Sequence, residues 1–134
     1  MPSASLSLQK AVVGKLKADI AVSALVGTSV FDTPNADVFP RITLGEDQVL
    51  TERADCYEGD EVILTIHAWS REIGFPQVKR IGSAVRAALQ GADLTLDDYR
   101  LVDIAVEDER YMRDPDGITS HAVLTFRALT EPTD

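Results

Sequence analysis

Apolar and polar residues alternate along several stretches of the chain, and this period of two predicts β-strands. The clearest stretch covers residues 61–70, where Val62, Leu64, Ile66 and Ala68 line one face and the other also carries Ile63 and Trp69. Apolar residues on both faces predict a central strand that is covered on both sides, either by a helix or by a neighbouring subunit. Similar alternation predicts strands over residues 99–110 and 119–129, and a short one over residues 41–45. The sequence Asp114-Pro115-Asp116-Gly117 fits a type I turn between the last two strands.

Two further stretches have apolar residues at helical spacing. Residues 5–25 predict one helix, since apolar positions recur every four residues and Gly27 suits its end. Pro76 opens a second, strongly amphipathic helix over residues 77–90, in which Gly82 would let the helix approach the sheet closely. The predicted fold class is α+β: an antiparallel or mixed β-sheet with two main helices packed on one side. A length of 134 residues fits a single domain that spans residues 1–134.

Residues 46–60 differ from the rest of the chain in their charge. They contain six acidic residues against one basic residue, Arg53. A long acidic connection inside a small domain is typical of a functional or partly disordered loop. An extended hairpin that carries charge for solubility explains the same residues equally well. We therefore expect a long acidic loop or hairpin at about residues 46–60, with both interpretations open.

The overall charge narrows the classes of partner. The net charge is −9, from 22 acidic and 13 basic residues. This balance weighs against a protein that reads nucleic acid, and equally against binding to an anionic membrane. The first residues lack the features of a signal peptide, and no stretch is apolar enough for a membrane span. With a single cysteine, Cys56, no intrachain disulfide is possible. We expect a soluble protein made in the cytoplasm.

Candidate chemistry is sparse. His67, His121 and Cys56 have no short metal-ligand spacing, and no base can be assigned to Ser70, so we expect no catalytic residue, no metal and no cofactor. His67 is interpreted as a hydrogen-bonded or interface histidine. Trp69 is interpreted either as a core residue, which the sequence favours slightly, or as an interface anchor. The candidate assembly interface comprises Asp47, Arg53, Tyr57, His67 and Trp69.

The order of these features resembles a known family. The segment from Pro40 to Gly45, the strand end at His67–Ser70, the helix after Pro76 and the hairpin from Asp114 to Phe126 together resemble the tail-completion, or tail-terminator, proteins of long-tailed bacteriophages and gene transfer agents. The resemblance implies a structural virion protein without enzymatic activity. Copies would form a ring, typically hexameric, that ends the tail tube at its head-proximal end and joins it to the head-tail connector.

The partners implied by the resemblance are other copies of the chain, the tail tube protein and the connector (stopper) protein. DNA would pass through the ring without specific binding. The location would be the head-proximal end of the virion tail, after synthesis in the bacterial cytoplasm. The alternative is a small soluble adaptor or ligand-binding α+β domain outside a virion. A deep pocket with convergent polar groups would favour the ligand-binding version of that alternative.

Overall fold

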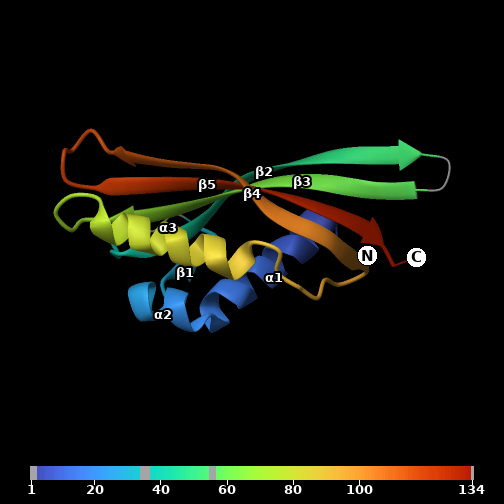
Figure 1. The fold of residues 1–134 in the computed structure, drawn as a ribbon, viewed down its shortest axis with the longest axis horizontal. Coiled ribbons are helices and arrows are strands. Elements are labelled where there is room, and N and C mark those ends of the chain that lie inside the picture. The colour runs from blue at the N-terminus through green and yellow to red at the C-terminus, as the bar shows by residue number, and fades with distance from the viewer. Residues whose placement is uncertain (1–2, 34–36, 55–56, 134) are drawn as a thin grey trace.

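A long twisted sheet with helices on one side forms the body of the molecule (Figure 1). The computed structural model describes residues 3–33, 37–54 and 57–133, with only the backbone for residues 52–54 and 57–58. In these residues the chain forms three helices and five strands: α1 (Ala4–Ala18), α2 (Ile20–Val26), β1 (Val30–Phe31), β2 (Arg41–Ala54), β3 (Tyr57–Ser70), α3 (Pro76–Leu89), β4 (Tyr99–Arg113) and β5 (Ser120–Pro132). The predicted α+β class is confirmed.

The sheet is mixed, with the strand order β1-β2-β3-β5-β4. Only the short β1 runs parallel to its neighbour β2, and the other pairs are antiparallel. The strand predicted at residues 61–70 is indeed central, because β3 pairs with β2 on one side and with β5 on the other. The turn between β4 and β5 has the predicted hydrogen bond, in which Gly117 N donates to Asp114 O at 2.9 Å.

The single helix expected over residues 5–25 is instead two helices, and Asp19 is the reason. Asp19 has an extended backbone (ψ 128°), and its side chain accepts a hydrogen bond from Val22 N at 3.0 Å. This carboxylate therefore caps the start of α2 and ends α1, as short polar side chains do at helix N-termini. The apolar spacing did not reveal the break, because Ile20 continues the four-residue spacing of α1. In the structure Ile20 is 88% exposed and does not belong to the core.

The core lies between the helices and one face of the sheet. Strand residues such as Ile66 and Phe126 meet helix residues such as Leu8 and Ile81, and all four are at most 1% exposed. Gly82 allows α3 to lie close to β4, as predicted, because a Cβ atom there would come within 2.2 Å of the Tyr111 hydroxyl.

The strands are longer than the sequence predicted, most of all around the acidic segment. Residues 46–60 belong to a hairpin, since β2 and β3 pair from Asp47 opposite Leu64 to Ala54 opposite Tyr57. The hairpin interpretation therefore describes this segment, apart from residues 55–56, which include Cys56 and lie outside the described residues. Likewise β5 continues to Pro132, where the pattern predicted an end at Leu129.

The second face of the sheet is not covered by any element of the described chain. All three helices lie on one side in Figure 1, and the other side is bare. The expectation that β3 is covered on both sides therefore holds for one face only within the described residues. No helix in the described part of the chain is long and apolar enough to cross a membrane.

Candidate assembly interface

The bare side of the sheet, which we call the open face, carries the side chains that alternate with the core. Strand register places these residues in rows across β2, β3, β5 and β4. At the end of the sheet near the β4–β5 turn, one row crosses Arg41, Trp69, His121 and Met112, and the next crosses Thr43, His67, Val123 and Arg110. Further along β3 the same face carries Thr65, Ile63 and Glu61. Most of these residues are half-buried by their lateral neighbours.

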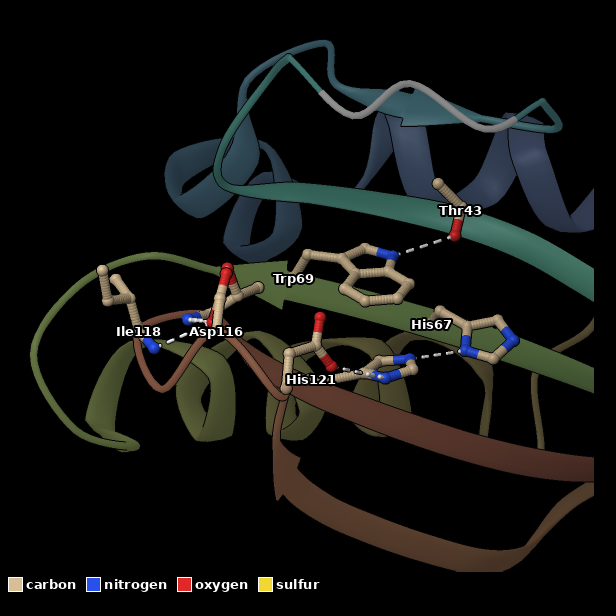
Figure 2. A network of polar contacts seen from close by, with 8 residues as sticks. Thr43, His67, Trp69, Asp116, Ile118 and His121 are labelled. Carbon is tan, nitrogen blue, oxygen red and sulfur yellow. Dashed lines mark hydrogen bonds and ion pairs between the residues drawn. The ribbon is translucent and has the colours of Figure 1, made fainter.

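Three rings stack on the open face where these first two rows meet (Figure 2). Trp69 lies almost parallel to His121, with ring centroids 3.7 Å apart and an interplanar angle of 13°. His67 follows, with its centroid 4.9 Å from that of His121. The indole nitrogen of Trp69 donates to Thr43 Oγ1 at 3.2 Å, which fixes the ring across β2 and β3. The stack links β3 with β5, and the hydrogen bond to Thr43 links both to β2.

The two histidines also share a hydrogen bond, so the prediction of a hydrogen-bonded His67 is confirmed. His67 Nδ1 lies 2.7 Å from His121 Nε2, and one of the two nitrogens carries the proton. The outer nitrogens face carboxylates: His67 Nε2 is 3.9 Å from Glu46, and His121 Nδ1 is 3.7 Å from Asp114. Burial lowers the pKa of both histidines, although the nearby carboxylates oppose this effect. Both imidazoles are therefore neutral at neutral pH.

Arg41 borders the stack and is unusually buried for an arginine, at 7% exposure. Its guanidinium lies over the ring of Phe39 at 4.6 Å and over the ring of Trp69 at 4.9 Å, as cation–π contacts require. Burial lowers the pKa of Arg41, and the carboxylates of Asp114 and Asp37 oppose that shift. Such a group remains charged, because the ordinary pKa of arginine is far above neutrality.

The structure brings together two of the five residues predicted for the interface. His67 and Trp69 are neighbours in the stack, with centroids 6.0 Å apart. Asp47 points to the opposite side of the sheet, where the Ser5 hydroxyl of α1 donates to its carboxylate. Arg53 and Tyr57 occupy adjacent rungs of the β2–β3 hairpin, and their side chains lie outside the described part of the structure.

Sequence reasoning missed Arg41, Thr43 and His121 as members of this surface. Their period-two positions place each of them on one face of its strand, but no local signal says which strands are neighbours. The pairing of Trp69 with both Arg41 and His121 supplies that information. The strand order together with the register of β2 and β5 against β3 would therefore have been needed to predict the cluster.

The opposite half of the open face is dominated by carboxylates. Arg127 bridges Glu61 and Glu107 at 3.1 and 2.8 Å. On the edge strand β4, Asp103 and Asp108 are exposed, and Asp103 has no hydrogen bond or ion pair within the described residues. The open face thus has an aromatic, arginine-rich end and an acidic end.

Two other features bear on the ligand-binding alternative. An open groove of about 540 Å³ lies between α1 and β1, lined among others by Lys10, Lys17, Phe31 and Asp32. Its polar groups belong to exposed or half-exposed side chains at the rim rather than to a buried, convergent set. Across the described chain, no three His, Cys, Asp or Glu side chains are placed to hold a metal ion.

Comparison with known proteins identifies the family. The family model for "Tail completion protein gp17" matches residues 10–131. The chain belongs to this family of tail completion proteins. The structure of this tail completion protein also matches that of a chain from the virion of a native gene transfer agent particle. The two chains are 31% identical, and the TM-score is 0.89. That match covers 98% of this chain and 99% of the other.

A second solved structure, the gp17 protein of bacteriophage SPP1, has the same fold. It matches with 22% identity and a TM-score of 0.64, over 93% of this chain and 89% of that chain. No curated protein sequence matches the chain. As a tail completion protein, the chain is a structural component of the virion tail of a phage or gene transfer agent.

Proposed function

We propose that this tail completion protein ends the tail tube at its head-proximal end. Copies form a closed ring, of six subunits, that stops tube growth and contacts both the tail tube protein and the head-tail connector. Family membership over residues 10–131 is the observation that carries the proposal. The protein acts in this role by binding other proteins, without catalysis.

The shape of the subunit supports assembly into a ring. The open face carries half-buried aromatic and apolar side chains that the described chain does not cover, including Trp69, His67 and Ile63. Exposed apolar surface rimmed by charges is typical of protein–protein contacts. The β2–β3 hairpin extends this surface beyond the helices, and its position at one end of the molecule suits contact with a neighbour (Figure 1). We propose that Asp47, Arg53, Tyr57, His67 and Trp69 make contacts within the ring or with the tube; His67 and Trp69 would do so from the open face, and Asp47 from the side of the sheet that carries the helices.

The proposal is tested by deleting the gene in cells that produce the particle. Electron microscopy of the lysate should show heads and tubes unjoined, with tubes of abnormal length, because nothing then stops polymerisation of the tube protein. Expression of the chain from a second locus should restore particles of uniform length. Joined particles of normal tail length in the deletion strain would refute the role.

A second measurement tests the ring itself. Native mass spectrometry of the protein bound to purified tube ends should give six copies per tube. A stoichiometry of one or two copies would contradict the ring while leaving a role in the tail intact.

A further inference from the structure

The groove between α1 and β1 combines an apolar lining with two lysines. Val13 and Phe31 contribute apolar surface, and Lys10 and Lys17 lie at its rim. Lys10, Gly14 and Lys17 share one face of α1, because they are four and three residues apart, and the two lysines are separated by about 10 Å along the helix. A Cβ atom at Gly14 would have no neighbour within 4 Å, so the groove is open between the lysines.

The groove is locally positive in a chain that is acidic as a whole. Lys10 and Lys17 are exposed and form no ion pair within the described residues. Among the described lining residues, Asp32 is the only acid, and its carboxylate accepts a hydrogen bond from Gln9 at 3.3 Å. Polar groups at the rim of an apolar surface are typical of a protein contact. The groove therefore suits a protein segment that carries both carboxylates and an apolar side chain.

The β2–β3 hairpin has this chemistry. Residues 46–60 contain six acidic residues and one basic residue. Within this acidic segment, Val49 and Leu50 of β2 are each 41% exposed. Exposed aliphatic side chains between carboxylates are the counterpart of an apolar groove between lysines, so the two surfaces are complementary in charge and in polarity.

The hairpin cannot enter the groove of its own copy. β1 forms one side of the groove, and it pairs with β2 at Ile42 and Thr43. Leu50 is seven residues beyond Thr43 on β2, and seven residues of a strand span about 23 Å. Pairing with β3 keeps this part of β2 extended, and the hairpin points away from β1 in Figure 1. Contact between these two surfaces therefore needs a second copy of the chain.

We propose that the groove between α1 and β1 receives the β2–β3 hairpin of a second copy. Leu50 of the incoming hairpin lies against Gly14, and the neighbouring carboxylates lie beside Lys10 and Lys17. The inference rests on the proposed ring and assigns the two surfaces that meet in it. Because the groove and the hairpin are different surfaces, the contact is heterologous, and each copy gives one hairpin and receives one.

A photocrosslinker on the hairpin identifies what the hairpin touches. Leu50 is replaced by the photoreactive residue p-benzoylphenylalanine, assembled particles are irradiated, and the cross-linked peptides are mapped by mass spectrometry. The cross-links should join the hairpin to residues 10–32, in products with the mass of two or more copies. Cross-links to the tail tube protein or the connector in place of residues 10–32, or to another part of a second copy, would overturn the proposal.

Two lysines of α1 provide a matched pair of charge variants. On purified tail-tube ends, Lys17→Glu should lower the yield of the cross-link per bound copy about threefold or more, because an attractive charge pair becomes repulsive. Lys15→Glu makes the same change in the same last turn of α1, but Lys15 does not line the groove. It should leave the yield unchanged, although it opposes the helix dipole equally. Equal yields from the two variants would contradict the placement of the hairpin.

Gly14 allows the groove to be filled without disturbing the fold. The space above Gly14 is open, and leucine favours helix more than glycine does, so Gly14→Leu should fold, as circular dichroism would show. Its side chain occupies the position proposed for the incoming Leu50, so the cross-link to residues 10–32 should be lost. An undiminished cross-link in the folded variant would refute docking in the groove.

These outcomes are separable from those of the gene deletion. Unjoined tubes in the deletion strain together with cross-links outside residues 10–32 would refute the contact between hairpin and groove and leave the role at the tube end intact. Cross-links to residues 10–32 together with normal tails in the deletion strain would do the reverse.

Discussion

The contact between α3 and β4 gives a prediction that tests the fold directly. Gly82 lies buried in the middle of α3, and a Cβ atom there would be 2.2 Å from Tyr111 Oη, 3.0 Å from Cζ and 3.1 Å from Cε1. The ring of Tyr111 is stiff, and its hydroxyl donates to Glu109 at 2.9 Å. Gly82→Ala must therefore move the helix away from the sheet or displace the ring and break that hydrogen bond.

Gly14 provides a matched control. It lies in the interior of α1, it is exposed, and a Cβ atom there would have no neighbour within 4 Å. Both substitutions gain about 0.5–1 kcal/mol of helix propensity, because alanine loses less conformational entropy than glycine on folding. Gly82→Ala alone also pays the overpacking cost of about 1–3 kcal/mol. The free energy of unfolding of Gly82→Ala should thus be lower than that of Gly14→Ala by about 1–3 kcal/mol.

Urea unfolding followed by circular dichroism measures this difference. In thermal unfolding it corresponds to a lower Tm, by about 3–5 °C per kcal/mol for a chain of this size. Tyr111→Phe removes the nearest atom, so it should destabilise Gly82→Ala less than it destabilises the natural sequence. If Gly82→Ala proved as stable as Gly14→Ala, the close approach of α3 to β4 would be wrong.

Two further predictions concern the histidine pair and DNA. Because burial lowers the pKa of His67 and His121 below the ordinary 6.5, the unfolded chain binds more protons than the folded one just below that pH. The pair's contribution to stability should therefore be complete above about pH 6.5 and be lost as the pH falls further. Urea unfolding at pH 7.5 and at pH 5.5 should show that the free energy of unfolding falls less between these two pH values for His121→Gln than for the natural sequence. An equal fall in both proteins would contradict this. With a net charge of −9, the isolated protein should not bind double-stranded DNA at physiological salt in a fluorescence anisotropy assay, whereas tight, steeply salt-dependent binding would reopen a nucleic-acid function.

Local signals in the sequence predicted most of the fold. The alternation over residues 61–70, the helix opened by Pro76 and the turn before Gly117 each depend on residues close together in the chain, and each is present. The errors arose where a short polar side chain ends a helix, or where pairing with a distant strand sets the length of a strand. Asp19 breaks the first helix by capping the second. The extension of β2 and β3 into the acidic segment depends on the pairing of the two strands rather than on their apolar pattern.

The open face was predictable only in part, for a related reason. His67 and Trp69 were recognisable because a histidine and a tryptophan alternate with core residues on one strand. Arg41 and His121 join them only through the register of β2 and β5 against β3. The alternation of β5 gives the face of His121 but not its neighbour, so sequence patterns predict single strands better than they predict surfaces.

The distribution of charge bears on when copies assemble. Copies with a net charge of −9 repel one another within a Debye length of ~8–10 Å. Free copies therefore meet a repulsive barrier before short-range contacts between their surfaces can form. A partner that holds several copies side by side, as the end of a tail tube would, removes the need to cross that barrier by diffusion. Under the proposed function, the same subunit would remain dispersed in solution and would form its ring only at the tube end.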